Sequence, residues 1–321
     1  MPGLILPERG ASVNKRSNTG PRRELRNLGM MAGLGIILYF CVQMLISFVI
    51  TVTPLREIYE SNMSVRYAFS CVASILSVGG VFYVIRLLEG RLLGIRCSFP
   101  MRPNGALSFI LAIPSGFALC LCANYVATLV GMMTESVGVE LSQPEQLLPT
   151  DPAGIAVYLI SVALIPPIVE EFAIRGVVMQ PLLKYGRGFA VTASALVFGI
   201  LHGNPKQMVF AFVSGLVIGY FVSSTGSLLT GIAIHLVNNA FSVANSYLIQ
   251  AGQDGVASVL LVAAIGIGLV CLILYLIFGI PSGGQERKIT GGRWRFFINA
   301  VFLLAAALMA LNAAQYINPV G

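Results

Sequence analysis

The chain has 321 residues, of which 56% are hydrophobic and only 10% are charged. Soluble domains carry about 25% charged residues, so this composition excludes an ordinary soluble domain and indicates a polytopic membrane protein. The formal net charge of +7 does not predict nucleic-acid binding, because the basic residues cluster in short segments between apolar runs, as membrane topology requires.

The first 27 residues are polar and basic, and we predict a cytoplasmic tail there. The apolar run that follows is too long for the core of a signal peptide and has no evident cleavage site, so we interpret it as a retained first span. The six cysteines mostly lie within apolar runs, and their spacing predicts neither a disulfide framework nor a zinc site.

A membrane-spanning helix needs about 20 mostly apolar residues. The runs that meet or approach this length lie at 28–53, 66–87, 106–132, 153–174, 188–203, 207–222, 228–249, 256–279 and 296–316. Two of them, 188–203 and 207–222, are short. We therefore predict an all-α membrane bundle of eight or nine transmembrane helices, with residues 28–321 forming a single domain.

Lys and Arg crowd the tail and the connections around 86–102, 184–187 and 287–295, whereas the alternate connections hold mainly acidic residues. By the positive-inside rule, the N-terminus lies in the cytoplasm and the protein is a multi-pass protein of the cell membrane. The sequence contains no visible internal repeat, which counts against an inverted-repeat transporter.

The polar residues that are energetically unfavourable inside a bilayer are concentrated in one part of the chain. The protein has only two histidines, His202 and His235, and both fall inside apolar runs. Of its 13 acidic residues, Glu170 and Glu171 alone lie deep in a predicted span, and Arg175 follows them. A charge near the bilayer centre costs about 2.5–3.5 kcal/mol, so this concentration predicts one buried polar site.

Helical spacing indicates how these residues face each other. Glu171 and Arg175 are four apart, so they share a helix face and can form an ion pair. Glu170 is turned about 100° away, so its carboxylate is the one that Arg175 leaves available. His235 and Asn239 are also four apart, and both side chains can point at one spot.

Each feature taken alone has a plainer interpretation. Glu171 and Arg175 could form a purely structural ion pair, and a lone histidine in a membrane could be a hydrogen bond between helices. Asn239 could likewise join two helices, and we interpret its neighbour Asn238 as a packing residue. The order, spacing and scarcity of these residues together favour a single site.

Three short stretches carry a family resemblance: EEFAIR (170–175), FGILH (198–202) and HLVNN (235–239). They resemble the EExxxR, FxxxH and HxxxN motifs of the CPBP family, the CAAX-prenyl-protease and bacteriocin-processing intramembrane endopeptidases. The motifs occur in order on consecutive hydrophobic segments. The resemblance covers about residues 150–250, where we place the protease core.

The resemblance implies an α-helical membrane protease whose site lies in a cavity between helices. It implies that Glu170 acts as a base on a water molecule, aided by His202. It further implies that His235 and Asn239 stabilise the oxyanion. Amide hydrolysis needs such a proton acceptor and such donors, and the chain shows no recognisable Ser or Cys nucleophile motif.

The remaining motif residues have supporting roles in the resemblance: Glu171 and Arg175 as a pair, and Phe198 as a packing residue. We favour a reaction without a cofactor or metal, because there is no HExxH motif. Zinc remains an alternative, and its ligands would then be Glu170, His202 and His235, with water in the fourth position.

The resemblance implies hydrolysis of a membrane-bound or prenylated protein or peptide, with the lipid bilayer as the other partner and no nucleic acid. It does not predict an oligomeric state. Two other functions stay open. One is a proton-coupled transporter that uses the Glu and His side chains as a relay, and the other is a catalytically silent immunity or scaffold protein.

Topology also bears on access to the site. The chain leaves the fourth span near Lys184, and the HLVNN helix begins just after a turn at 223–227. Both positions are on the predicted cytoplasmic side, which favours a cavity that opens towards the cytoplasm. The turn between His202 and Lys206 fits this less well, because it lies nearer the other face.

Overall fold

The computed structural model describes residues 20–95, 97–143, 147–279 and 292–319. Most of the predicted tail, 1–19, lies outside these residues. The first helix, α1 (Pro21–Val52), already begins at Pro21. Residues 21–27, which we assigned to the tail, are therefore helical. Pro21 suits the first position of the helix, because the amide at that position makes no hydrogen bond within the helix.

Helices occupy all of the predicted apolar runs. After α1 come the short α2 (Leu55–Ser61), α3 (Met63–Ser74), η1 (Ile75–Gly80), α4 (Val81–Leu88), η2 (Glu89–Leu93) and α5 (Ala106–Ser136). The next long helix consists of α6 (Pro152–Leu159), η3 (Ile160–Leu164), α7 (Ile165–Glu171), η4 (Phe172–Met179), α8 (Gln180–Leu182) and η5 (Leu183–Tyr185). The last are α9 (Arg187–Leu201), α10 (Pro205–Thr225), α11 (Leu228–Gln250), α12 (Asp254–Phe278), η6 (Arg293–Phe296) and α13 (Ala300–Ala314).

The structure confirms an all-α polytopic membrane bundle. Within the described residues, six helices are long and apolar enough to cross a bilayer: Pro21–Val52, Met63–Leu93, Ala106–Ser136, Pro152–Tyr185, Pro205–Thr225 and Asp254–Phe278. Two shorter apolar helices, Arg187–Leu201 and Ala300–Ala314, accompany them. The polar residues of α11, among them His235, Asn238 and Asn239, lower its hydropathy. The number of crossings, eight or nine, stays a prediction.

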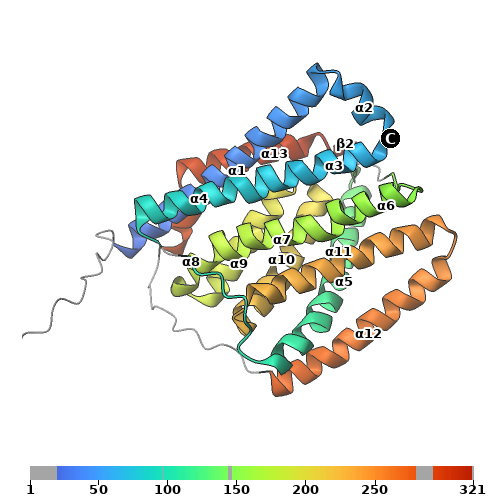
Figure 1. Cartoon of the computed structure of the whole chain (residues 1–321). Helices are drawn as coiled ribbons and strands as arrows, with labels where there is room; N and C mark the ends of the chain where they lie inside the picture. Colours follow the sequence, from blue (N-terminus) through green and yellow to red (C-terminus); the bar gives the residue numbers. More distant parts are fainter. Residues whose placement is uncertain (1–19, 96, 144–146, 280–291, 320–321) are drawn as a thin grey trace, which may run out of the picture.

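The helices pack side by side with two distinct ends (Figure 1). At one end, Lys184 forms an ion pair with Glu24 near the start of α1. Arg293 donates a hydrogen bond from Nη2 to the carbonyl oxygen of Tyr185, 2.7 Å away. We call this the basic end, because it gathers the connections rich in Lys and Arg.

Short segments that follow α5 and α13 lie at the opposite end. There β1 (Val139–Leu141) pairs antiparallel with β2 (Ile317–Pro319), a small sheet that the apolar pattern did not predict. Tyr247 on α11 donates a hydrogen bond from its hydroxyl to the carbonyl oxygen of Pro149, 2.8 Å away. These contacts connect the segments after α5 and α13 to the rest of the bundle.

The long helix Pro152–Tyr185 is not a regular α-helix. Two π-helical segments, η3 and η4, lie on either side of α7, which carries Glu170 and Glu171. Pro166 and Pro167 stand between η3 and these glutamates, and a proline has no amide hydrogen to donate to the preceding turn. Such wide turns occur often at functional sites, and they set the direction of the residues that follow.

Close helix packing depends on individual glycines. Gly268 on α12 faces α5, and a Cβ added there would lie 2.3 Å from Cβ of Ala118 and 2.5 Å from the carbonyl oxygen of Pro114. Gly266, two residues earlier, has no atom within 4 Å of the same added Cβ. The two positions therefore form a matched pair on one helix.

We expect Gly268→Ala to lower the free energy of unfolding by about 1–3 kcal/mol, the usual cost of overpacking. Gly266→Ala should leave it unchanged or slightly raised. Thermal unfolding of the purified variants in detergent measures the difference. Equal stability of the two variants would show that α5 and α12 do not approach as closely as the structure indicates.

Candidate active site

A buried ion pair forms the foundation of the site. Nη1 of Arg175 lies 2.9 Å from Oε1 of Glu171, and neither side chain has exposed surface. Nη2 of Arg175 donates a second hydrogen bond to the carbonyl oxygen of Gly215, 3.1 Å away on α10. The predicted pairing of Glu171 with Arg175 is thus present, although η4 widens the helix between them.

The same carboxylate also holds one of the two histidines. Nδ1 of His235 lies 3.1 Å from Oε1 of Glu171. Because a carboxylate held by Arg175 only accepts hydrogen bonds, Nδ1 of His235 carries the hydrogen and Nε2 faces away. Gly231, one turn earlier on α11, leaves room for this contact, since a Cβ there would lie 2.5 Å from Oε2 of Glu171.

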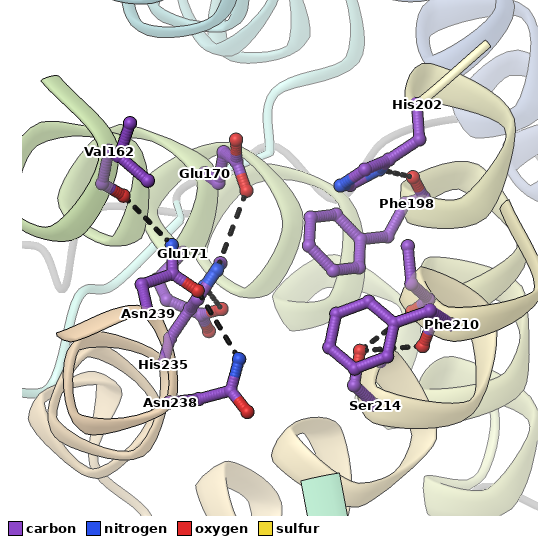
Figure 2. A network of polar contacts seen from close by, with 12 residues as sticks. Val162, Glu170, Glu171, Phe198, His202, Phe210, Ser214, His235, Asn238 and Asn239 are labelled. Carbon is purple, nitrogen blue, oxygen red and sulfur yellow. Dashed lines mark hydrogen bonds and ion pairs between the residues drawn. The ribbon is translucent and has the colours of Figure 1, made fainter. Parts of the chain in front are cut away.

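Glu170 points to the other side of His235. Its Oε2 lies 3.8 Å from Nε2 of His235, and 19% of its side chain is exposed, whereas the side chain of Glu171 is fully buried. Figure 2 shows His235 directed towards both glutamates. The ion pair with Arg175 is made by Glu171, so Glu170 is the carboxylate left with access to a cavity.

His202 ends α9 and faces the same region from a different helix. Its Nδ1 lies 2.9 Å from the carbonyl oxygen of Phe198. A carbonyl oxygen only accepts hydrogen bonds, so Nδ1 carries the hydrogen and Nε2 keeps its lone pair. His202 is therefore arranged as a proton acceptor, with its ring supported by its own helix (Figure 2).

Phe198 packs against three of the site residues. Its ring centroid lies 4.7 Å from that of His202 and 5.9 Å from that of His235, both edge-on. Cζ of Arg175 lies 4.9 Å from the same ring centroid. The aromatic ring thus separates the two histidines and covers the guanidinium, in agreement with the packing role that we expected.

Asn239 compensates for the two prolines of the glutamate helix. In an α-helix the carbonyl oxygen of Val162 would accept from the amide of residue 166, and in a π-helix from that of residue 167, but both are prolines. Nδ2 of Asn239 donates to this carbonyl oxygen instead, 3.0 Å away. One amide hydrogen of Asn239 is used in this way, and the second is left for another acceptor.

Asn238, which we interpreted as packing, contacts Asn239. Its Nδ2 lies 3.3 Å from Oδ1 of Asn239, and it lines the same cavity as Asn239. The two adjacent asparagines gave no spacing signal, because neighbouring residues on a helix point about 100° apart. Only the position of the surrounding helices brings both to one hollow.

Three hollows meet at the site. A small cavity of about 180 Å³ is lined by Glu170, His202 and Phe198 together with Tyr39 and Gln207. Tyr39 lies on α1 in an apolar run, and nothing in the sequence identified it. Gln207 lies five residues after His202, at the start of α10. A polar side chain so close to a motif histidine is a sequence signal for a site residue.

Two larger cavities adjoin the small one. The first, of about 490 Å³, lies between α1 and α3 and reaches Glu170 and Tyr39; we call it the α1–α3 cavity. The second, of about 690 Å³, lies between α5, α10 and α11 and reaches His202 and Asn239; we call it the α5–α11 cavity. Glu170 and His202 thus face one small space from opposite sides.

Both larger cavities lie towards the opposite end of the bundle rather than the basic end. Arg56 of α2 lines the α1–α3 cavity, and Gln143 beside β1 lines the α5–α11 cavity. A cytoplasmic N-terminus and a cytoplasmic opening, which we expected together, are therefore not compatible in this arrangement.

The alternative zinc set does not fit the observed geometry. Across the part of the chain that the structure describes, no three His, Cys, Asp or Glu side chains gather as metal ligands. Glu170 and His235 are neighbours, but His202 faces them across the small cavity and beside the ring of Phe198.

Comparison with known proteins agrees with the motifs. Residues 152–241 match the family model described as type II CAAX prenyl endopeptidase Rce1-like. The chain is 27% identical over 136 residues to the membrane-embedded CAAX protease MroQ of Staphylococcus aureus. The matched segment covers 40% of this chain and 54% of that protein. It is 26% identical over 138 residues to the putative membrane peptidase YdiL of Bacillus subtilis, covering 43% and 56%.

This chain spans about half the length of the curated relatives that it matches. No solved structure is similar enough to count as a match. The matched region contains all three motifs, which agrees with the family that they resemble.

The bond from Asn239 to Val162 can be tested by a double-mutant cycle. We expect Asn239→Ala to cost about 1 kcal/mol of stability, because it leaves the carbonyl oxygen of Val162 without its donor. In a Pro166→Ala background the new amide hydrogen can reach this oxygen, so the same substitution should cost less. Thermal unfolding of the four proteins gives the coupling, and a cost unaffected by Pro166→Ala would contradict this account.

Proposed function

We propose that the chain is an intramembrane endopeptidase, because residues 152–241 match the family model described as type II CAAX prenyl endopeptidase Rce1-like. Its catalytic residues are Glu170, His202, His235 and Asn239. The observation that carries the proposal is the position of Glu170, a partly accessible carboxylate 3.8 Å from His235 in a cavity that His202 also lines.

The first step follows from the orientation of the two proton acceptors. A water molecule in the small cavity would lie between Glu170 and Nε2 of His202. Glu170 takes a proton from this water as its oxygen attacks the carbonyl carbon of the peptide, and His202 holds the water through its lone pair. Water attack fits a site whose side chains are carboxylates, imidazoles and amides.

The second step uses the residues of α11. The tetrahedral intermediate carries a negative oxygen, which the second amide hydrogen of Asn239 can bind. Nε2 of His235 can donate to the same oxygen when the ring is doubly protonated, because the hydrogen on Nδ1 is held by Glu171. The C–N bond then breaks, and the proton on Glu170 passes to the leaving amine.

Glu171 and Arg175 act as positioning residues in this scheme. Glu171 fixes the tautomer and the direction of His235, and Arg175 holds Glu171 in a fully buried position. Phe198 keeps the two imidazoles apart. The reaction as proposed needs no metal, and its chemistry is that of a glutamate-type protease.

The substrate proposed for this site is a membrane-associated protein or peptide, prenylated or not. The printed descriptions of the relatives, a membrane-embedded CAAX protease and a putative membrane peptidase, support this class. The cavities around the site lie between apolar helices, so a substrate reaches them most directly when it is already held at the bilayer.

We expect Glu170→Gln to reduce kcat by about 10²–10⁴-fold, the usual contribution of a general base, without a loss of folded protein. His202→Gln should reduce kcat by a similar factor. The assay uses the full chain in liposomes with a pool of bilayer-tethered peptides, half of them farnesylated at a C-terminal CAAX sequence. Mass spectrometry identifies the cleavage products.

A suitable control is Glu140→Gln, since Glu140 is an exposed acidic residue of β1 outside the site. It should cleave like the unchanged protein. Treatment with 1,10-phenanthroline should leave the rate unchanged, whereas a metal-dependent rate would contradict the glutamate mechanism. Full activity of Glu170→Gln would overturn the proposal altogether.

For orientation, we propose that the N-terminus is cytoplasmic, so that both large cavities open on the extracytoplasmic side. Arg91 at the basic end and Gln143 at the opposite end are both exposed. In a variant without the native cysteines, Gln143→Cys should react with a membrane-impermeant maleimide added outside intact cells, and Arg91→Cys should not. The reverse pattern would place the openings in the cytoplasm.

A further inference from the structure

The α1–α3 cavity is more polar than its place between membrane helices requires. Of its 15 lining residues, ten carry a polar or charged group. They include Gln43, Ser47 and Thr51 on α1 and Ser70 and Ser74 on α3. Some of these groups have partners in the bundle: Gln43 donates to Ser77, and Thr51 and Ser70 donate to carbonyl oxygens of their own helices. Their side chains nevertheless line the cavity, where a hydroxyl or amide oxygen can still accept a hydrogen bond.

These polar residues form a continuous path towards the reacting groups. Tyr39, Gln43, Ser47 and Thr51 follow one another four residues apart, so they lie on one face of α1. The path ends at Glu170, which lines the same cavity. Arg56 and Glu60 of α2, paired at 2.8 Å, stand at the other end, where the exposed segment of α2 joins α1 and α3 (Figure 1).

The small cavity shares lining residues with each of the two large cavities and so lies between them. Tyr39, Val78 and Glu170 line both the α1–α3 cavity and the small cavity. His202 and Gln207 line both the small cavity and the α5–α11 cavity. A chain that passes from one large cavity to the other would therefore cross the space between Glu170 and His202.

We propose that the α1–α3 cavity binds an extended polypeptide segment of the substrate on one side of the scissile bond, and that the α5–α11 cavity receives the other side. This inference rests on the proposed function and specifies its substrate as a peptide bond within a chain, with residues bound on both sides. The main chain of an extended peptide carries one donor and one acceptor per residue. The hydroxyl and amide side chains along the cavity can bond to these donors and acceptors. An acyl or isoprenoid chain has no such groups, so a peptide suits the cavity better.

The dimensions of the wall give the length of this segment. Tyr39 and Thr51 are 12 residues apart on a helix that rises about 1.5 Å per residue, so the wall is about 18 Å long. An extended peptide spans about 3.3 Å per residue. The cavity therefore accommodates about five or six residues beside the bond that is cleaved.

Photo-crosslinking tests this occupant without requiring cleavage. In a Glu170→Gln background, p-benzoylphenylalanine is placed at Ser47 or Ser74, which line the cavity. The control positions are Leu45 on α1 and Leu76 on η1, which are 60% and 50% exposed and do not line it. The probe is the pool of bilayer-tethered peptides, biotinylated, in phosphatidylcholine liposomes. We expect peptide labelling at Ser47 and Ser74 at least about 10-fold above that at Leu45 and Leu76.

Crosslinks from Ser47 and Ser74 to lipid alone, or equal peptide labelling at all four positions, would refute the proposal. Cleavage by the unchanged protein together with such a result would refute this inference and leave the proposed function intact. Specific peptide crosslinks without any cleavage by the unchanged protein would refute the proposed function and leave only peptide binding in the cavity.

A second measurement uses steric blocking of the cavity. Ser74→Phe should raise KM about 10-fold for a cleaved peptide with full flanks, whereas Leu76→Phe should not change it. Removing six residues from the flank bound in the α1–α3 cavity should make the two variants and the unchanged protein equal. If the effect of Ser74→Phe follows the presence of a farnesyl group and not the flank length, the occupant is a lipid chain and the proposal is wrong.

Discussion

The ion pair between Glu171 and Arg175 is the interaction on which the rest of the site depends. Two fully buried charges within a membrane helix are tolerated only when each offsets the charge of the other. Oε2 of Glu171 and Nε of Arg175 have no hydrogen-bond partner among the described residues. Gly215 supplies a carbonyl oxygen to Arg175, and His235 shares the oxygen of Glu171 that faces Arg175. The pair thereby connects three helices, and a change in it would move the histidine that faces Glu170.

A second constraint comes from the backbone of the glutamate helix. Pro166 and Pro167 remove two amide hydrogens a few residues before Glu170, and the π-helical segments around α7 change the helix faces there. In hydrocarbon an unpaired carbonyl oxygen is expensive, so the bond from Asn239 to Val162 has a structural reason of its own. The same side chain thus supports the helix and lines the α5–α11 cavity.

The sequence alone was sufficient for the local features. Apolar runs located the helices, and four-residue spacing correctly paired Glu171 with Arg175 and left Glu170 unpaired. Features that depend on the packing of helices against each other, or on irregular backbone, were not predictable. Tyr39 lies in an apolar run with no motif, and the π-helical segments and the β1–β2 pair have no periodic signature. Asn238 was dismissed because its direction depends on neighbours that spacing does not reveal.

The role of α1 has a consequence for the selectivity of this chain. The matched region, 152–241, carries every motif residue, yet Tyr39 of α1 encloses the small cavity and α1 forms one wall of the cavity beside it. Replacement of this helix would leave the reacting groups unchanged while it alters the shape next to them. Substitutions in α1 are therefore a way to change the selectivity of this chain while its motif residues stay the same.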